Sequence, residues 1–186
     1  VALWGDPNVV VTCDDPRAFA SLTGYFDIIV ADVPCSGEGM FRKDEHAQQQ
    51  WSEDNVALCE GRQRRILADV WPSLRNDGVL VYSTCTFNRY ENDGNVRWIA
   101  ENLGAEVLPN DLGGNGVIMT ECGYSLVPGF VEGEGQYCSS LRKTADPEYV
   151  EGSVGRGNDR PQKPSALPGD LEGLFSVKMK FALKGD

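Results

Sequence analysis

Two cysteines stand where a thiol could react. Cys35 lies in ADVPCSGEG, residues 31–39, directly after an apolar run, and Cys85 lies in VYSTCTF, residues 81–87, after another apolar run. A cysteine attacks as its thiolate, and a partly exposed loop near the N-terminus of a helix lowers its pKa. Burial alone would not explain why each thiol follows its strand, among residues with special backbone preferences. We therefore predict two reactive thiols.

The remaining cysteines fit neither a disulfide framework nor a zinc site. The chain has six cysteines in 186 residues, at positions 13, 35, 59, 85, 122 and 138, and no signal-peptide pattern precedes them. No two cysteines have the short spacing of a zinc-ligand pair, and His46 is the sole histidine. We expect reduced thiols and no metal, with Cys59 and Cys138 acting as small apolar side chains.

Composition favours one globular domain followed by a tail. At 186 residues and 41% hydrophobic positions the chain can bury one core. No run approaches the roughly 18 apolar residues of a membrane span, so we expect a cytoplasmic protein without a membrane partner. The net charge of −11 argues against nucleic-acid binding by bulk attraction. Local basic groups, Arg42-Lys43, the run Arg62 to Arg65 and Arg142-Lys143, could still contact a nucleic acid, although a solvated surface is the simpler interpretation of each.

The first two thirds of the chain alternate strands and helices. Residues 9–12 and 26–31 are β-branched apolar runs typical of buried parallel strands. A helix is predicted from Ser52, a plausible N-cap, and Pro72 should kink or end it. A strand at 79–83 follows, and then a helix over 90–103 that Gly104 closes. This order predicts an α/β fold.

The last third of the chain predicts short strands and loops in place of alternating strands and helices. Residues 117–120, 124–130 and 136–143 read as strands, the last two as an antiparallel pair across EGEG. Residues 144–170 are rich in Gly, Pro and charge and are predicted to be a linker or long loop. Residues 175–182 alternate polar and apolar and could form a strand, so that 171–186 would begin a following segment.

Both thiols are predicted at the same edge of the sheet. In open parallel α/β sheets, ligands bind just outside the carboxyl ends of the strands. Residues 32–35 and 84–85 lie at two such ends. They could therefore face one crevice although they are far apart in the sequence.

The motifs taken together resemble a known family. DVPCSGEGMFRKD, WSED, QRRIL, NDGVLVYSTCTFNRYEN and GEG…LRK, in this order over residues 4–143, are similar to the NOL/NOP/Sun RNA cytosine-5 methyltransferases. The bacterial branch that modifies small-subunit ribosomal RNA is the most similar, which implies 16S ribosomal RNA as the substrate. The resemblance implies the C-terminal part of a Rossmann-like methyltransferase fold, ending in an antiparallel strand pair, with S-adenosylmethionine as cofactor and RNA as partner.

The resemblance also implies roles for individual residues. Cys85 would be the nucleophile that adds to carbon 6 of cytosine, which activates carbon 5 toward the methyl donor. Cys35 would assist release of the methylated base. Asp32 would border both the cofactor and the target ring, with Pro34 also on the cofactor side, and Asp15 would contact the adenine end. Asp14, beside Asp15, is expected to be a turn or cap residue.

Departures from the family pattern leave alternatives open. A glycine-rich loop and an acidic residue that hold the cofactor in this class are expected before Val1, so residues 1–143 would form a partial catalytic domain, inactive alone. One alternative is a non-catalytic fragment or an RNA-binding or scaffolding domain that keeps the fold, and 171–186 could begin an RNA-binding domain. A second alternative is a DNA cytosine methyltransferase, against which STCTF and GEG…LRK argue. The oligomeric state stays open.

Overall fold

A single mixed sheet organises the structure, a computed structural model that describes residues 9–110, 112, 114–144 and 181–184. Within these residues the strand order is β4-β5-β6-β2-β1-β7, and β3 pairs with β6 off this path. The strands are β1 (Phe26–Asp32), β2 (Leu74–Thr84), β3 (Ala105–Val107), β4 (Val117–Met119), β5 (Tyr124–Leu126), β6 (Gln136–Lys143) and β7 (Phe181–Lys184).

The parallel pair β1–β2 sets the position of the two cysteines. Ile29 faces Leu80 and Asp32 faces Ser83 in the register, so both strands end at the same edge of the sheet. β6 lies antiparallel on the other side of β2, and β5 pairs antiparallel with β6, as the sequence predicts. β7 lies parallel to β1 at its outer edge.

Two main helices follow from recognisable capping signals. α2 (Glu53–Val70) begins where the Ser52 hydroxyl accepts a hydrogen bond from the backbone N–H of Asn55 at 3.0 Å. It ends at the short 3-10 turn η3 (Trp71–Ser73), which contains Pro72. α3 (Asn95–Leu103) ends at Gly104, whose φ of 71° suits a glycine cap. The helix expected over residues 90–103 begins with the π-helical turn η4 (Tyr90–Gly94) and continues as α3.

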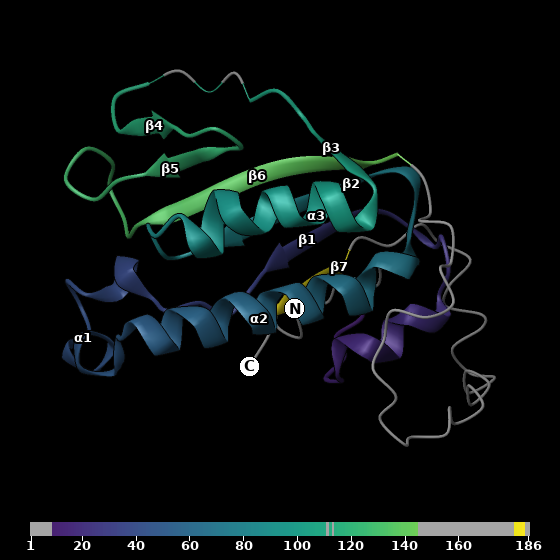
Figure 1. The fold of residues 1–186 in the computed structure, drawn as a ribbon, viewed down its shortest axis with the longest axis horizontal. Helices are drawn as coiled ribbons and strands as arrows, with labels where there is room; N and C mark the ends of the chain where they lie inside the picture. Colours follow the sequence, from purple (N-terminus) through teal and green to yellow (C-terminus); the bar gives the residue numbers. More distant parts are fainter. Residues whose placement is uncertain (1–8, 111, 113, 145–180, 185–186) are drawn as a thin grey trace.

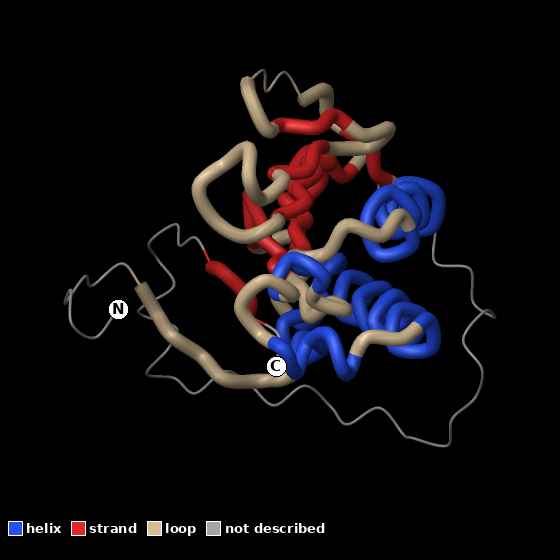
Figure 2. The backbone as a smooth tube through the Cα atoms, turned by 90° about the vertical axis from the view of Figure 1, so that its left-hand side faces the viewer, coloured by secondary structure: helices blue, strands red, loops and turns tan. Residues whose placement is uncertain are grey.

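Shorter helical segments connect these elements. They are η1 (Pro16–Ser21), η2 (Glu38–Met40) and α1 (Glu45–Gln50). α2 and α3 lie against the same face of the sheet, α2 near β1 and α3 near β2 and β6 (Figure 1). Figure 2 shows the same arrangement from the side, with the helices gathered on one side of the strands.

The core lies between these helices and the sheet. On the opposite face, alternate residues of β1 remain exposed, with Ile28 and Val30 each 38% accessible. A parallel strand in an α/β protein is normally covered on both faces. The described residues thus cover one face only. The buried apolar cluster comprises Phe26, Ile29, Ala31, Val33, Ile66, Leu67, Val70, Trp71, Leu74, Leu80, Tyr82, Val96, Ile99, Leu103, Cys122, Tyr137 and Leu141.

The structure differs from the predicted strands in two places: one predicted strand is absent, and one observed strand was not predicted. Residues 9–12 form no strand, and Val9 and Val11 are 41% and 72% exposed. β-branched residues favour extended backbone, but a strand forms only where a neighbouring strand pairs with its backbone N–H and C=O groups. None of the described residues pairs with this run. β3 was not predicted because it has three residues and follows α3 directly. The expected linker and most of the strand expected at 175–182 lie outside the described residues.

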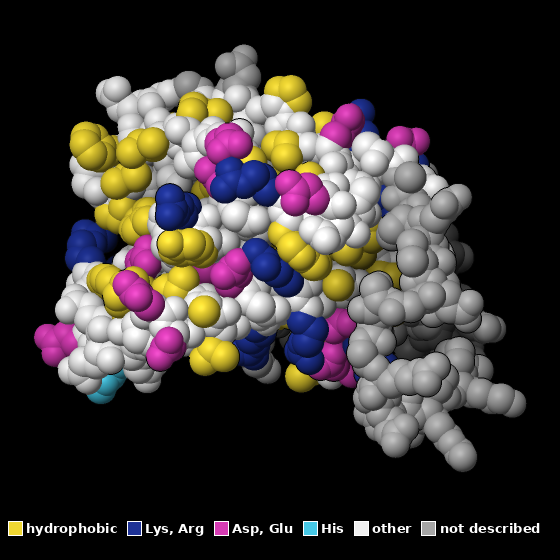
Figure 3. All heavy atoms as spheres, viewed as in Figure 1, with side chains coloured by type: hydrophobic (Ala, Val, Ile, Leu, Met, Phe, Trp, Pro, Cys, Tyr) yellow, Lys and Arg dark blue, Asp and Glu magenta, His cyan; other side chains and the backbone are white. Residues whose placement is uncertain are grey.

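The visible surface carries charges of both signs over the helices (Figure 3). Hydrophobic side chains gather over β4 and β5 in the same view. Ile118 and Met119 of β4 and Phe130, which follows β5, are exposed. In the part of the chain that the structure describes, no helix combines the length and apolar character that crossing a bilayer would require.

Candidate active site

The two predicted thiols lie side by side. The sulfur atoms of Cys35 and Cys85 are 3.1 Å apart, although the residues are separated by 50 positions. Each follows the carboxyl end of a strand, Cys35 after β1 and Cys85 directly after β2, so the parallel register brings them together. Both side chains are half-buried and both thiols are free. The structure therefore brings both cysteines together at one edge of the sheet, as the sequence predicts.

The contact between the two sulfur atoms shifts the pKa values of the two thiols in opposite directions. The hydrogen bond from Cys35 lowers the pKa of Cys85 below its usual value, although burial and the carboxylates of Asp32 and Glu91 oppose this. The same hydrogen bond, with burial, raises the pKa of Cys35. These opposite pKa shifts favour Cys85 over Cys35 as the thiol that ionises, with the S–H of Cys35 as the hydrogen-bond donor. The nucleophile role that the resemblance implies for Cys85 stays a prediction.

Asp32 lies at the same edge. Its Oδ1 accepts hydrogen bonds from Ser83 Oγ at 2.8 Å and from Gln136 Nε2 at 3.4 Å. Its Oδ2 accepts none from the described residues, and the side chain is exposed. This carboxylate can therefore accept a further hydrogen bond from a ligand. Pro34 is half-buried two residues further on, and its carbonyl accepts a hydrogen bond from Gln63 Nε2 at 2.9 Å.

Asp15 lies apart from this group. Its carboxylate caps η1 by accepting from the backbone N–H of Arg17 at 3.0 Å, and it pairs with Arg65 at 3.8 Å. No hydrogen bond or ion pair between described residues joins it to Asp32 or to the thiols. The cap role expected of Asp14 belongs to Asp15; Asp14 Oδ1 instead accepts from the N–H of Asp15 at 2.8 Å. The residue directly before η1 is the one whose carboxylate can reach the first N–H groups of that turn, and this residue is Asp15.

A glycine allows the loop after Cys35 to touch the chain at Cys85. The backbone N–H of Gly39 donates to the carbonyl of Cys85 at 2.8 Å. A Cβ at Gly39 would lie 2.8 Å from that carbonyl oxygen and 2.8 Å from the carbonyl oxygen of Gly135. Next to it, the Glu38 carboxylate accepts from the N–H of Phe87 at 2.8 Å and from Trp51 Nε1 at 2.9 Å. These contacts hold the two thiol-bearing segments together.

Sequence reasoning missed a buried polar cluster behind the thiols. Glu91 and Gln63 are fully buried, and Asn88 joins them to the loop that carries Cys35. Hydrophobic periodicity cannot reveal such residues, because their polar type marks them as surface positions. The signal available was the density of hydrogen-bonding side chains in FNRYEN, directly after the Cys85 motif.

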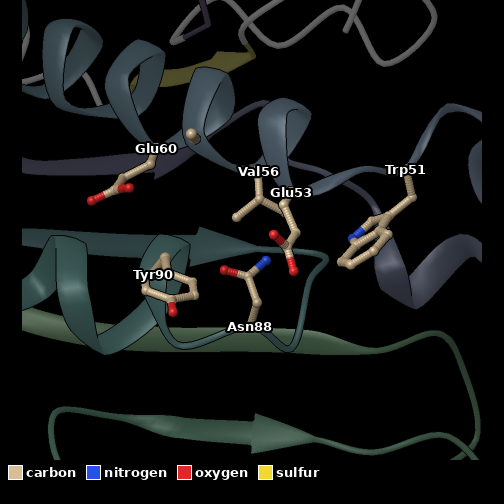
Figure 4. A pocket seen from close by; sticks show the side chains of 7 residues that line it. Trp51, Glu53, Val56, Glu60, Asn88 and Tyr90 are labelled. Carbon is tan, nitrogen blue, oxygen red and sulfur yellow. The ribbon is translucent and has the colours of Figure 1, made fainter.

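A pocket of about 340 Å³ lies on the other side of Asn88 (Figure 4). It opens between the first turns of α2 and η4, and Trp51 and Tyr90 stand at opposite ends of it in the view. The two cysteines are not part of its wall. Its lining residues are Trp51, Glu53, Val56, Ala57, Glu60, Asn88 and Tyr90.

The basic pairs noted in the sequence are largely occupied. Lys43 forms an ion pair with Glu134, and Arg42 donates to the carbonyl of Gly133 at 3.3 Å. Lys143 is buried and donates to the carbonyls of Trp71 and Leu74. Lys143 therefore supports the fold and cannot contact an RNA phosphate. Among the residues described, no three His, Cys, Asp or Glu side chains gather in a way that could hold a metal ion.

Comparison with known proteins identifies similar sequences. The family model described as 16S rRNA methyltransferase RsmB/F matches residues 4–142. Ribosomal RNA small subunit methyltransferase F of Escherichia coli O157:H7 is 40% identical over 150 residues, which are 77% of this chain and 31% of the relative. The protein of the same name from Pectobacterium atrosepticum is 38% identical over 150 residues, with the same coverage of each chain. The chain thus spans about a third of the length of these relatives.

Solved structures show the same fold. NSun6 from Pyrococcus horikoshii, solved with SFG, superposes with a TM-score of 0.61 at 25% identity, over 74% of this chain and 35% of that one. A methyltransferase homolog protein from Pyrococcus horikoshii gives a TM-score of 0.60 at 27% identity, over 73% and 45%. The architecture around the two thiols is therefore part of a methyltransferase fold, and the expected fold class is confirmed.

Proposed function

This chain belongs to the 16S rRNA methyltransferase RsmB/F family, and from that premise we propose that it carries the reacting residues of an enzyme that methylates carbon 5 of cytosine in ribosomal RNA. The observation that supports this proposal most is the 3.1 Å contact between the sulfur atoms of Cys35 and Cys85. Methyl transfer to carbon 5 needs a thiolate that first adds to carbon 6, and the contact lowers the pKa of one thiol of the pair.

The proposed reaction begins with Cys85. Its thiolate forms a bond to carbon 6, and the electron pair of the carbon 5–carbon 6 double bond moves onto carbon 5 and the ring. In this proposal the Asp32 carboxyl group lies beside ring nitrogen 3, where a proton shared between the two stabilises the negative charge that develops on the ring. Carbon 5 then forms a bond to the methyl group that S-adenosylmethionine would supply when bound, and the bond between that methyl group and the cofactor sulfur breaks. Asp32 offers a free carboxylate oxygen at the strand end, and we assign it to the cofactor together with Pro34 and Asp15.

Release reverses the first bond. Carbon 5 loses its proton to water, the double bond forms again, and the bond from carbon 6 to sulfur breaks with Cys85 leaving as a thiolate. Cys35 holds a proton in contact with that sulfur, so its thiol stabilises the departing thiolate by a hydrogen bond. This contact supports the proposed division of roles, in which Cys85 attacks and Cys35 assists release.

Two other functions predict different results. A non-catalytic fragment or scaffolding domain would keep the fold but form no covalent bond with RNA. A DNA cytosine methyltransferase would prefer DNA substrates. The pairing of thiols from two different strand ends favours a working covalent centre over a scaffold, because a scaffold does not require the second thiol. A cytoplasmic location stays a prediction from the sequence.

Covalent capture tests the proposal. The full-length protein is incubated with S-adenosylmethionine and ribosomal RNA fragments that contain 5-fluorocytosine, which blocks the proton loss needed for release. We expect an adduct that survives denaturant, that Cys85→Ala abolishes, and that excess RNA but not DNA competes away. Absence of any adduct in the wild-type protein would support the scaffold, and capture that survives Cys85→Ala would assign the attack to another residue.

A further inference from the structure

The peptide groups on both sides of Cys35 are held by the same pair of side chains. The carbonyl of Pro34, which precedes the cysteine, accepts a hydrogen bond from Gln63 Nε2 at 2.9 Å. The N–H of Ser36, which follows it, donates to Glu91 Oε2 at 3.0 Å. Gln63 Nε2 also donates to the same carboxylate oxygen at 2.6 Å, so the two holding groups contact each other. The backbone of Cys35 is therefore fixed before and after its side chain.

The surroundings of Glu91 require a carboxylate. The side chain is fully buried, and its two oxygens accept hydrogen bonds from three donors of the described residues: the N–H of Ser36, Gln63 Nε2 and Asn88 Nδ2, the last at 2.7 Å. A glutamine of the same shape would direct its own N–H groups at one of these donors. Burial of an ionised carboxylate without a cation is costly unless such hydrogen bonds surround it. A glutamate is therefore required at position 91, because a carboxylate accepts hydrogen bonds at both oxygens and donates none.

Asn88 completes the arrangement. Its Nδ2 donates to the hydroxyl of Ser36 at 3.2 Å, and its Oδ1 accepts from the N–H of Glu91 at 3.0 Å. The hydroxyl of Ser36 also lies 3.0 Å from that of Thr86, the residue after Cys85. The clamp formed by Gln63 and Glu91 therefore connects the two thiol-bearing segments to one buried cluster.

We propose that Glu91 and Gln63 are positioning residues that fix the backbone of Cys35, so that its thiol stays in hydrogen-bond contact with the sulfur of Cys85. Neither residue touches a reacting atom. Both act through the loop of residues 34–36. Without their hydrogen bonds to its backbone, the loop would no longer hold the Cys35 thiol in one orientation. The catalytic meaning of this role rests on the proposed function, whereas the contact itself can be measured without RNA or cofactor.

The test uses a double-mutant cycle on the acidity of Cys85. In the 186-residue chain, the rate at which iodoacetamide alkylates Cys85 is followed against pH by mass spectrometry of its peptide. Charged or titratable groups that influence this thiol are Asp32, Cys35 and Glu91. Cys35→Ala removes the hydrogen bond that lowers the pKa of Cys85, so alkylation at neutral pH should slow about tenfold, the effect of one hydrogen bond to a charged group.

The same comparison is then repeated with Glu91→Gln present. Removal of the Glu91 charge changes the pKa of Cys85 directly, but this change is common to both members of the second pair and cancels. If Glu91 positions Cys35, then Cys35→Ala should alter the alkylation rate by less than about twofold in this background. An undiminished tenfold effect in a folded Glu91→Gln protein would overturn the proposal.

A matched control lies on the same turn. Asp93 Oδ1 also accepts three hydrogen bonds, from Thr120 Oγ1, the N–H of Cys122 and Tyr137 OH, but these come from β6 and the segment around β5, away from the thiols. Asp93→Asn should leave the tenfold coupling intact. Equal loss of coupling in Asp93→Asn would show general loosening and would overturn the specific role.

A second variant covers the case in which Glu91→Gln does not fold. Gln63→Met keeps the volume of the side chain but removes its hydrogen bonds to the Pro34 carbonyl and to Glu91, and also those that its Oε1 accepts from Tyr82 and Asn95. It should also reduce the coupling. Full coupling in folded Gln63→Met would refute the role of Gln63. Failure of RNA capture in the full-length wild type would instead count against the proposed function and would leave the result of the cycle unchanged.

Discussion

Gly39→Ala should destabilise the chain, because a methyl group has no space where the two thiol-bearing segments meet. Its Cβ would lie 2.8 Å from the carbonyl oxygens of both Cys85 and Gly135 and 3.2 Å from the Cα of Gly135. All three atoms belong to the backbone, so no side chain can rotate away. The N–H of Gly39, which donates to Cys85 at 2.8 Å, would be displaced with them.

The magnitude follows from these two losses. Overpacking of a tight site costs about 1–3 kcal/mol, and loss of one backbone hydrogen bond costs about 0.5–1.5 kcal/mol. The free energy of unfolding should therefore fall by about 3 kcal/mol, and since a chain of this size loses roughly 2–4 °C per kcal/mol, its melting temperature should fall by about 10 °C.

Gly61→Ala is the matched control. Gly61 lies in the exposed middle of α2, where an added Cβ would meet nothing within 4 Å. Alanine is the better helix former, so this change should stabilise the chain by about 0.5–1 kcal/mol. Thermal unfolding followed by circular dichroism in reducing buffer compares the two variants. A melting temperature of Gly39→Ala at or above that of the wild type would refute the tight contact at Cys85.

Four further outcomes are expected. As pH rises, iodoacetamide should label Cys85 before Cys59, because the pKa of Cys85 is lowered and burial raises that of Cys59; the reverse order would contradict the assignment of the thiolate. Cys35→Ala in the full-length protein should accumulate a denaturant-resistant RNA adduct on gels, and loss of all adduct would show that Cys35 attacks. Asp15→Asn should keep the η1 cap and the melting temperature but weaken cofactor binding by the full-length protein, whereas Asp15→Ala should also cost about 1 kcal/mol of stability; equal cofactor affinity in all three would remove Asp15 from the cofactor site. The 186-residue chain alone should bind S-adenosylmethionine about two to four powers of ten more weakly than the full-length protein, since it spans about a third of the length of its relatives and the resemblance implies two further polar anchors that each contribute roughly 1.5–3 kcal/mol; micromolar binding in calorimetry would contradict this.

Local signals predicted the elements that carry the thiols. Ser52 and Gly104 mark helix ends by capping chemistry that acts within a few residues, and the structure confirms both. The apolar runs before Asp32 and Thr84 predicted parallel strands, and parallel strands that pair bring their carboxyl ends to one edge. The meeting of Cys35 and Cys85 therefore followed from strand order and could be anticipated without side-chain detail.

The misses have a physical reason in common. The run at 9–12 has strand propensity, but pairing depends on a partner that its own residues do not specify. Glu91 and Gln63 are polar types that a sequence pattern assigns to the surface, and only tertiary contacts show that donors surround them inside the protein. The role of Asp15 as the η1 cap depended on the direction of one turn, which composition does not determine.

The π-helical turn η4 makes the length of this segment more critical than its composition. The N–H of Gly94 donates to the carbonyl of Arg89 at 2.8 Å, a spacing of five residues where an α-helix uses four. Glu91, inside the turn, supports the loop of Cys35, and Asn95, just after it, donates to Gln63 Oε1 at 2.6 Å. Deletion of one residue between them would rotate Glu91 by about 100° around the helix axis relative to Asn95. Only one of the two could then face the interior, so single-residue deletions in residues 92–94 should be tolerated far less than substitutions at the exposed positions nearby.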